Sequence, residues 1–224
     1  MVGSDDVDVA QDLIPPLTSD PPLQLYIVRH GESIANVRQV FSNYDQSHGL
    51  TDKGRAQVEG LAEELTGVRF AEFYCSPVFR AQQSAQILSA QLGIEYVTST
   101  ALAEYDVGEL EGKSDAASWQ HYYAVQDAWF RDKDFSARIS GGESFEDIRA
   151  RFVPFIDALL ASPPPGPVLL LGHGGTFRCM LPLILSNITF EYIVEHHMAN
   201  ADVVVAEQRS NELVCVRWGP RRTF

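Results

Sequence analysis

Three short segments of the sequence carry residue types that can do chemistry. His30 follows an apolar run with Arg29 directly before it, and His173 follows a second apolar run. Arg80 comes shortly after a third run, which ends at Ser76. An imidazole with an ordinary pKa of about 6.5 can act as a nucleophile or exchange protons at neutral pH, and the planar arginine fork suits a phosphate. These residue types favour the capture of an anionic group, phosphate above all, beside a reactive histidine.

Each of these residues also has an ordinary structural explanation. A single histidine at a strand end is more often a hydrogen-bonded structural group than a catalyst, and Arg80 alone would be a solvated helix residue. Two His-Gly pairs that each follow an apolar strand, His30-Gly31 and His173-Gly174, are harder to explain in this way. The motifs therefore have to be judged together.

The overall charge makes a local cluster of cations more informative. The 224 residues include 17 lysines and arginines and 30 aspartates and glutamates, which gives a formal net charge of −13. A general nucleic-acid binder normally shows a basic face, so no nucleic-acid partner is expected. An anionic ligand must instead be bound by a few cations gathered in one place.

Hydrophobic patterning predicts the elements that would position these residues. Apolar runs predict buried strands over 23–30, 71–77, 94–100 and 167–173. Helical spacing and capping residues predict helices over 51–67, 79–93, 144–161 and 176–185, the last one bent or divided by Pro182. Two further β segments, 201–207 and 212–218, predict an antiparallel hairpin at the edge of the sheet.

The alternation of strands and helices predicts an α/β fold, a three-layer αβα sandwich with a mostly parallel sheet and one antiparallel edge region. Ligands of such open sheets bind beyond the carboxyl ends of the strands. The strands that end at His30, Ser76 and His173 would then bring two histidines and two arginines, Arg29 and Arg80, to one rim. The N-termini of the helices that follow would add backbone donors for the same anion.

A single domain over 23–218 is expected. Residues 1–22 are acidic and contain prolines, so they predict a flexible N-terminal tail, and 219–224 predict a C-terminal tail. No apolar run approaches the roughly 20 residues of a membrane span, and no basic-then-apolar signal pattern starts the chain. The three cysteines are far apart in apolar segments, as expected for buried thiols of a cytoplasmic protein with no membrane partner.

Motifs for bound metals and nucleotides are absent from the sequence. It contains no G-x-x-x-x-G-K-[ST], no G-x-G-x-x-G, no H-E-x-x-H and no paired C-x-x-C. His196 and His197 are adjacent and would point apart on a helix or strand, which favours a boundary position over a metal site. No metal and no cofactor are therefore expected.

Seven segments in order resemble the histidine phosphatase superfamily, in its phosphoglycerate-mutase-like branch. The segments are "VRHGES" at 28–33 with Asn36 behind it, "LTDKGRAQ" at 50–57, "SPVFRAQQSA" at 76–85, "LAEYDVGELEGK" at 102–113, "GGESFEDI" at 141–148, "LLLGHGGTFRCML" at 169–181 and "NADVVV" at 200–205. The match as a whole runs from about 23 to 218. The R-H-G motif alone would be weak evidence, but the ordered set is specific. It implies a phosphoglycerate-mutase-like fold.

The resemblance also implies a role for each site residue. His30 would be the nucleophile and form a phosphohistidine, while Arg29, Arg80 and His173 would neutralise the phosphoryl oxygens. Glu104 would protonate the leaving group and later activate water, although it could also be one of several surface carboxylates in 104–111. Residues expected to touch the same phosphate are Asn36, Ser42 and Gly174.

Relatives divide between mutases and phosphatases, and the acid segment favours a phosphatase here. The mutase pattern has Arg-His after the acid and an arginine pair further on, whereas this chain has Tyr105-Asp106 and Phe130-Arg131. The expected partner is a small phosphomonoester. A mutase, a non-catalytic phospho-ligand-binding protein and, less favoured, a protein phosphatase stay open as alternatives.

Residues 113–140 are expected to form a lid or insertion over the pocket. Their aromatic residues fit a small satellite core or a wall that recognises the leaving group: Trp119, Tyr122, Tyr123, Trp129 and Phe130. Four nearby cations fit either a second anionic group or solvated charges: Arg38, Lys113, Arg131 and Lys133. The hairpin at 201–218 offers an edge that could pair across a dimer.

Overall fold

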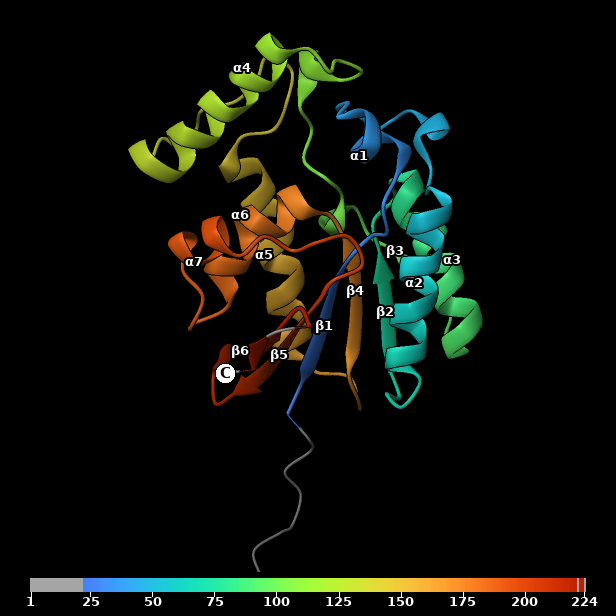
Figure 1. Cartoon of the computed structure of the whole chain (residues 1–224). Coiled ribbons are helices and arrows are strands. Elements are labelled where there is room, and N and C mark those ends of the chain that lie inside the picture. Colours follow the sequence, from blue (N-terminus) through green and yellow to red (C-terminus); the bar gives the residue numbers. More distant parts are fainter. Residues whose placement is uncertain (1–21, 221, 224) are drawn as a thin grey trace, which may run out of the picture.

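Seven strands form one mixed sheet in the computed structural model, which describes residues 22–220 and 222–223 (Figure 1). The strands lie in the order β3-β2-β4-β1-β5-β6-β7, and the first four are parallel. β5, β6 and β7 continue the sheet in antiparallel fashion. The strands are β1 (Gln24–Arg29), β2 (Glu72–Cys75), β3 (Val97–Thr98), β4 (Val168–Gly172), β5 (Val203–Arg209), β6 (Glu212–Trp218) and β7 (Arg222–Thr223).

Helices cover both faces of this sheet, which confirms the three-layer αβα sandwich (Figure 1). α2 and α3 lie on one face and α5 and α6 on the other, while α4 lies beyond the carboxyl ends of the parallel strands. The helices are α1 (Ile34–Arg38), α2 (Asp52–Leu65), α3 (Phe79–Leu92), α4 (Ala116–Asp127), α5 (Phe145–Ala161), α6 (Gly174–Ile184) and α7 (Phe190–Glu195). Short helical turns occur at Gln46–His48, Thr100–Leu102, Gly108–Leu110 and Ala128–Asp132.

Side chains that alternate along the strands supply the core on each face. Val28, Leu169 and Leu171 pack with α2 and α3, whereas Ile27 and Leu170 pack on the other side with α5 and α6. β4 is buried at every position, as expected for a parallel strand covered on both faces. The continuous apolar runs in the sequence therefore identified the central strands.

The predicted capping residues begin and end the helices as expected. The Thr51 hydroxyl accepts a hydrogen bond from Gly54 N at 3.0 Å, and Ser144 forms a reciprocal capping box with Asp147. Gly93 ends α3 in the left-handed conformation at φ 66°. α6 continues two residues past Pro182 before it ends at Ile184, so the proline does not divide this helix.

The register of the parallel strands places the strand ends before His30, Ser76 and His173 next to one another. Arg29 in β1 is paired with Gly172 in β4, and Cys75 in β2 is paired with Leu171. The residues that follow these pairs are His30, His173 and Ser76, and all three leave the sheet at its carboxyl edge.

Two predicted elements differ from the structure. The strand expected over 94–100 is reduced to the two residues of β3, because it lies at the edge of the sheet and both its side chains are exposed. The segment 102–142, for which no helix was expected, contains α4. The buried residues of α4 include Ser118 and Gln126, so the helix has no apolar stripe for sequence analysis to detect.

Residues 222 and 223, within the segment expected to be a C-terminal tail, form a strand. We predicted a loose tail over 219–224, but β7 pairs with Arg217 and Trp218 of β6, whose outer edge offers free backbone groups there. Further along this edge Leu213 is bridged by Leu185, and the Asn187 side chain bonds both the N–H and the carbonyl of Cys215. The edge expected to pair across a dimer thus already has partners within the chain.

The predicted N-terminal tail lies outside the described residues except for Pro22. Within the described part of the chain, no helix is both long and apolar enough to cross a membrane.

Candidate active site

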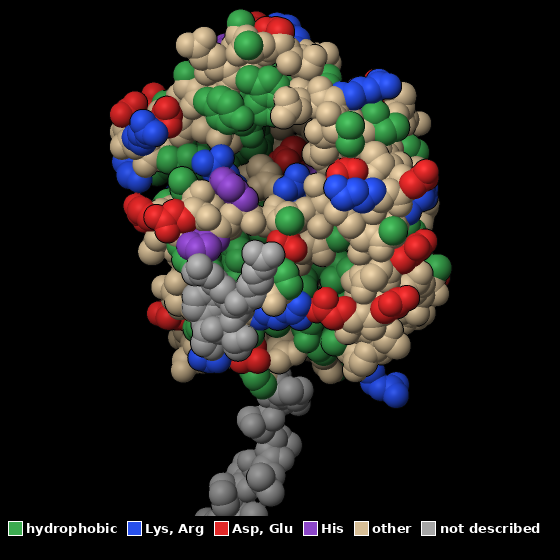
Figure 2. Space-filling model, in the orientation of Figure 1, with side chains coloured by type: hydrophobic (Ala, Val, Ile, Leu, Met, Phe, Trp, Pro, Cys, Tyr) green, Lys and Arg blue, Asp and Glu red, His purple; other side chains and the backbone are tan. Residues whose placement is uncertain are grey.

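A cavity of about 410 Å³ opens between the carboxyl edge of the sheet and α4. Figure 2 shows it as a hollow with basic and histidine side chains at its mouth and a hydrophobic cluster above. Its walls come from segments far apart in the sequence. They include the predicted residues Arg29, His30, Asn36, Ser42, Arg80, Glu104 and Gly174.

The hydrogen bonds of His30 fix its tautomer. Nδ1 lies 2.7 Å from the Gly31 carbonyl, which can only accept, so Nδ1 carries the proton. Nε2 therefore holds a lone pair, and it accepts a hydrogen bond from Arg80 Nε at 3.0 Å. Burial, with Arg80 and Arg29 nearby, holds the pKa of His30 well below its usual value. The neutral imidazole thus has one nucleophilic nitrogen, at the cavity wall.

His173 lies next to His30, with the ring centroids 5.0 Å apart, but it is fully buried. Its Nε2 is 2.7 Å from Ser76 Oγ, which also accepts a hydrogen bond from Val78 N. No other acceptor for the Ser76 hydroxyl proton lies within hydrogen-bond distance among the described residues, so we assign this proton to the bond with Nε2 and the ring proton of His173 to Nδ1. This buried Nδ1 has no partner among the described residues. It is a donor available to an anion beside His30.

Two of the buried histidines, His30 and His173, make stability depend on pH. Burial holds the pKa of His173, like that of His30, well below 6.5, so on acidification the unfolded chain binds protons before the folded one. Between pH 7.5 and 5.5 each histidine should therefore lower the free energy of unfolding, by at most about 1.4 kcal/mol, the value for a ring that stays neutral in the folded protein. In urea unfolding, the free energy of unfolding of His30→Asn should fall less on acidification than that of wild type. His121→Asn, at an exposed position, is the control. If the free energy of unfolding of His30→Asn depended on pH as steeply as that of wild type, the lowered pKa of His30 would be contradicted.

Two buried arginines flank His30. Arg80 donates from Nη1 to the Ser42 carbonyl and from Nη2 to Asn43 Oδ1 at 3.5 Å. Burial lowers the pKa of Arg80 to about 10, which leaves it charged at neutral pH. Arg29 donates from Nη1 to the Met198 carbonyl at 2.7 Å, while its buried Nε has no partner among the described residues. Both cations are thus held by neutral carbonyl oxygens, and their charge is left for an anion.

Glu104 is held at the N-terminus of α6. Its Oε2 accepts from Gly175 N at 3.0 Å, and its Oε1 accepts from Thr176 N at 2.7 Å and from the Thr176 hydroxyl at 3.0 Å. A Cβ at position 175 would lie 2.7 Å from Oε1, so only glycine allows this approach. Glu104 is the one carboxylate among the residues that line the cavity in the described chain, and not a surface charge.

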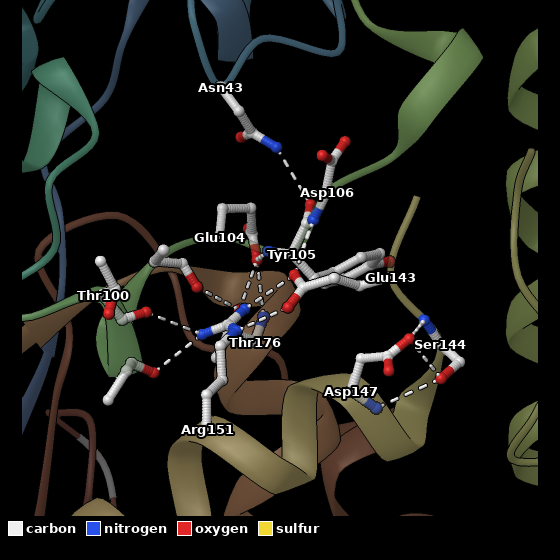
Figure 3. A network of polar contacts seen from close by, with 12 residues as sticks. Asn43, Thr100, Glu104, Tyr105, Asp106, Glu143, Ser144, Asp147, Arg151 and Thr176 are labelled. Carbon is white, nitrogen blue, oxygen red and sulfur yellow. Dashed lines mark hydrogen bonds and ion pairs between the residues drawn. The ribbon is translucent and has the colours of Figure 1, made fainter. Parts of the chain in front are cut away.

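An ion pair braces the segment that carries Glu104 (Figure 3). Arg151 Nε lies 2.7 Å from Glu143 Oε1, and Arg151 Nη1 donates to the carbonyls of Ala101 and Thr100 at 2.8 and 3.2 Å. Glu143 Oε2 in turn accepts from Asp106 N at 2.9 Å. The pair therefore fixes the chain on both sides of Glu104.

Loss of the ion pair between Arg151 and Glu143 should mainly slow a step in which Glu104 transfers a proton to the leaving group. We expect Arg151→Gln to lower kcat on alkyl phosphates by about tenfold to a hundredfold, because a small misplacement of an acid group is costly. Aryl phosphates, whose leaving groups need little protonation, should lose less. Arg149→Gln, on an exposed position of α5, is the matched control. Equal losses on both ester types would show a merely structural role.

Asn36 and Ser42, which were expected to touch the phosphate, both line the cavity but differ in the groups that they can offer a ligand. Asn36 Oδ1 accepts from Ser33 N and from Asn200, so its amide nitrogen is the group left to face a ligand. The Ser42 hydroxyl lies 2.8 Å from His48 Nδ1, and its carbonyl holds Arg80, so Ser42 contributes by fixing a cation.

Gly174 allows the guanidinium of Arg29 to pack closely. A Cβ at position 174 would lie 3.1 Å from Arg29 Nε. Glu32 is turned away from these groups and pairs with Lys53 at 2.7 Å, so it orients its neighbours.

Some aromatic residues of 113–140 form a wall of the cavity, and others form a small core. Trp119, Tyr122 and Tyr123 line the cavity, and the Trp119 ring lies 4.2 Å from that of Phe41. Trp129 is instead a core residue with 1% exposure, and its Nε1 donates to the Ala137 carbonyl. The segment therefore supplies both a cavity wall and a small core.

The third cation of the cavity, after Arg29 and Arg80, was not among the residues expected. Arg131 pairs with Asp127 on the surface, and Lys133 donates to the Phe130 carbonyl, while Arg38 and Lys113 are exposed away from the cavity lining. Arg178 on α6 lines the cavity instead. Sequence analysis passed over Arg178 because a charge within an apolar helix gives no sign of what it faces.

Among the described residues, no group of three or more His, Cys, Asp or Glu side chains could hold a metal ion. The cationic groups at the cavity are arginines, whose donors suit an oxyanion.

Comparisons with known proteins agree with this geometry. A family model described as the histidine phosphatase superfamily (branch 1) matches residues 25–220. The 2,3-bisphosphoglycerate-dependent phosphoglycerate mutase of Azorhizobium caulinodans is 31% identical over 203 residues, which cover 83% of this chain and 96% of the relative. A probable phosphoglycerate mutase of Cronobacter sakazakii is 29% identical and covers 73% of this chain and 75% of the relative.

Solved structures show the same fold. The mycobacterial glucosyl-3-phosphoglycerate phosphatase, in its complex with VO3, superimposes with a TM-score of 0.73 at 26% identity, over 88% of this chain and 98% of that one. A putative alpha-ribazole-5'-P phosphatase of Escherichia coli K-12 superimposes with a TM-score of 0.74 at 21% identity, over 90% and 98%. With a family model that spans nearly the whole described chain, this protein belongs to the histidine phosphatase superfamily, branch 1.

Proposed function

We propose that this protein is a metal-independent phosphomonoester hydrolase that acts on a small phosphorylated metabolite through a phosphohistidine. One observation carries the proposal. The neutral His30 has its nucleophilic Nε2 at the cavity wall, next to two arginines and to the unpaired Nδ1 donor of His173. A phosphate placed against Nε2 would meet donors on several sides.

The reaction follows from the protonation states of these groups. The Nε2 lone pair of His30 forms a bond to phosphorus while the ester P–O bond breaks, and a protonated Glu104 gives its proton to the leaving oxygen. The Gly31 carbonyl stabilises the positive charge that develops on the ring through its hydrogen bond from Nδ1. Arg29, Arg80 and His173 stabilise the charge on the transferring oxygens.

Water completes the cycle. Glu104 accepts a proton from water as the water oxygen bonds to phosphorus, and the N–P bond breaks. Inorganic phosphate leaves, and His30 returns to its neutral form. The cavity that holds these groups is walled by α4, which suits a small ester better than a protein loop.

Phosphate release from a panel of alkyl and aryl phosphomonoesters, with EDTA present, tests this proposal. Turnover in EDTA supports a reaction without a bound metal ion. Enzyme denatured in alkali during turnover should carry phosphate that is stable to base and labile to acid, as a phosphohistidine is. Turnover without such a label, or a label that survives acid, would contradict the proposed intermediate.

Phosphoglycerate mutase activity is the second candidate, because the relatives reported above carry that name at 29 to 31% identity. A mutase passes the phosphoryl group to a second substrate instead of water. Interconversion of phosphoglycerate isomers in the presence of a bisphosphate, faster than phosphate release, would favour this reaction.

A further inference from the structure

A buried histidine behind the cavity wall contacts a residue that lines the cavity. His48, at the end of the helical turn Gln46–His48, is 9% exposed and is not among the described residues that line the cavity. Its Nδ1 lies 2.8 Å from the hydroxyl oxygen of Ser42, which is also buried and does line the cavity. The proposed reaction gives His48 no part, so this buried contact requires an explanation.

A single guanidinium ties Ser42 to His30. Arg80 donates from Nη1 to the Ser42 carbonyl and from Nε to His30 Nε2 at 3.0 Å. A phosphoryl group held against His30 Nε2 therefore comes next to Ser42. Whether the Ser42 hydroxyl attracts or repels such a group depends on the direction in which its proton points.

The Ser42 hydroxyl proton has two directions open to it. Among the described residues, His48 Nδ1 is the one hydrogen-bond partner of this hydroxyl. If Nδ1 has no proton, the hydroxyl donates to it and presents only lone pairs to the cavity. If Nδ1 carries a proton, it donates to the Ser42 oxygen, and the hydroxyl proton is free to be donated to an anion in the cavity.

A nearby carboxylate favours a proton on Nδ1. Asp45 Oδ2 lies 3.6 Å from this nitrogen, and Asp45 Oδ1 caps the helical turn by accepting from Ser47 N at 2.8 Å. The hydrogen bonds from Ser47 lower the pKa of Asp45, so its carboxylate is charged at neutral pH. A lone pair on Nδ1 would face this negative oxygen, whereas an N–H is attracted to it. An anion in the cavity favours the same arrangement, because it accepts the freed hydroxyl proton.

The turn that carries His48 is held in place by its surroundings. It contacts α1 and α3, and the Gly49 carbonyl directly after it accepts from Ile34 N at 2.9 Å. A Cβ at position 49 would lie 2.5 Å from the side-chain oxygen of Gln83, so glycine there allows the turn to lie close to α3. The imidazole is therefore fixed relative to Ser42, as expected for a group that orients another.

We propose that His48 is a positioning residue for phosphate: its Nδ1–H donates to the Ser42 oxygen and thereby directs the Ser42 hydroxyl proton at a phosphoryl oxygen beside His30. The inference rests on the proposed function, because it gives the same phosphoryl group a further donor. His48 acts through Ser42 and does not itself touch the substrate.

Two variants of the same shape test this role. His48→Asn offers an amide N–H to Ser42 in place of Nδ1–H, so it should bind inorganic phosphate within about threefold of wild type. His48→Asp offers only an acceptor at neutral pH and takes the hydroxyl proton for itself. Loss of a donor to an anion should then weaken phosphate binding by about 10- to 100-fold. Isothermal titration calorimetry gives the dissociation constants, and unfolding is measured for each variant.

The Ser42→Ala background separates an effect through the hydroxyl from an effect of added charge. Ser42→Ala keeps the carbonyl that holds Arg80 and removes only the hydroxyl. The ratio of the dissociation constants of His48→Asp and His48→Asn should therefore fall by at least about threefold in this background. Gln46→Asp, which adds a carboxylate at an exposed position of the same turn, is the charge control and should bind phosphate within about threefold of wild type.

The position of the His48 proton can also be measured directly. Long-range proton–nitrogen correlation spectra of the phosphate-bound wild type, at a pH above the midpoint of the ring's own titration, should show the proton of neutral His48 on Nδ1. His48→Asn identifies these signals among those of the six histidines. This measurement decides the role even if His48→Asp fails to fold, because a neutral ring protonated on Nε2 overturns the inference.

The outcomes separate this role from the proposed hydrolysis. If esters are hydrolysed but His48→Asp and His48→Asn bind phosphate equally, the inference alone is overturned. It is also overturned if their ratio falls by less than about threefold in Ser42→Ala, or if the wild type binds no phosphate. Phosphate affinities that change as described, without turnover of any ester, support the role of His48 and contradict the proposed function.

Discussion

Replacing His30 with alanine is expected to lower kcat by at least about 10⁴-fold on every phosphomonoester, because loss of a nucleophile removes the covalent route altogether. The groups that remain, Arg29, Arg80 and His173, can still bind phosphate but have no lone pair to offer to phosphorus. Initial rates of phosphate release, with the alkali-stable label as a second measurement, check the prediction. The label should disappear together with the activity.

The same variant should keep its fold. The His30 ring lies at the cavity wall and bonds to the Gly31 carbonyl and to Arg80 Nε, so its loss enlarges a space that is already open. Thermal unfolding should therefore stay close to that of wild type at neutral pH, and His121→Ala, at an exposed position, is the control for both measurements. A folded His30→Ala protein with more than about 1% of the wild-type kcat would exclude His30 as the nucleophile.

Glu104→Gln is expected to slow the hydrolysis of different esters to different extents, depending on their leaving groups. An amide cannot supply a proton, so alkyl phosphates should be hydrolysed about 10²- to 10⁴-fold more slowly. Aryl phosphates release a stable phenolate, so bond cleavage from these esters should slow far less. A plot of log kcat/KM against the pKa of the leaving group should become steeper in the variant than in wild type.

The Glu104→Gln substitution also disturbs the hydrogen bonds that Glu104 accepts from Gly175 and Thr176, so a stability control is needed. If the oxygen of the new side-chain amide accepts from Thr176, the amide nitrogen faces Gly175 N, and one buried donor loses its partner at a cost of about 1–3 kcal/mol. Unfolding should be measured alongside the rates for this reason. Glu109→Gln, on an exposed carboxylate of the same segment, should change neither. Equal slowing of alkyl and aryl esters would show that Glu104 is not the acid.

Much of the fold could be predicted because its signals are local. β1 and β4 are short, nearly continuous apolar runs, and the predicted caps at Thr51, Gly93 and Ser144 are found in the structure. The exceptions lie where an element depends on distant neighbours. β3 is a short edge strand, and β7 forms only because β6 leaves backbone groups unpaired.

α4 shows why the rest could not be predicted. Its inward face carries Ser118 and Gln126, and its aromatic residues, Trp119, Tyr122 and Tyr123, line the cavity. No period of 3.6 residues results, so the helix was not expected. Gln126 becomes meaningful only when α6 brings Arg178 to within 2.9 Å of it.

The family, and the set of residues that gather around His30, could be predicted without the structure, because each of His30, Arg80 and His173 is tied to a local signal at the end of a strand or the start of a helix. Tertiary structure alone decided which nitrogen of each histidine holds its proton. For His173 that choice depends on Ser76, which is 97 residues away in the chain. It also decided that Arg178 is the third cation, since the partners of a charged side chain are set by packing between elements and not by its neighbours in sequence.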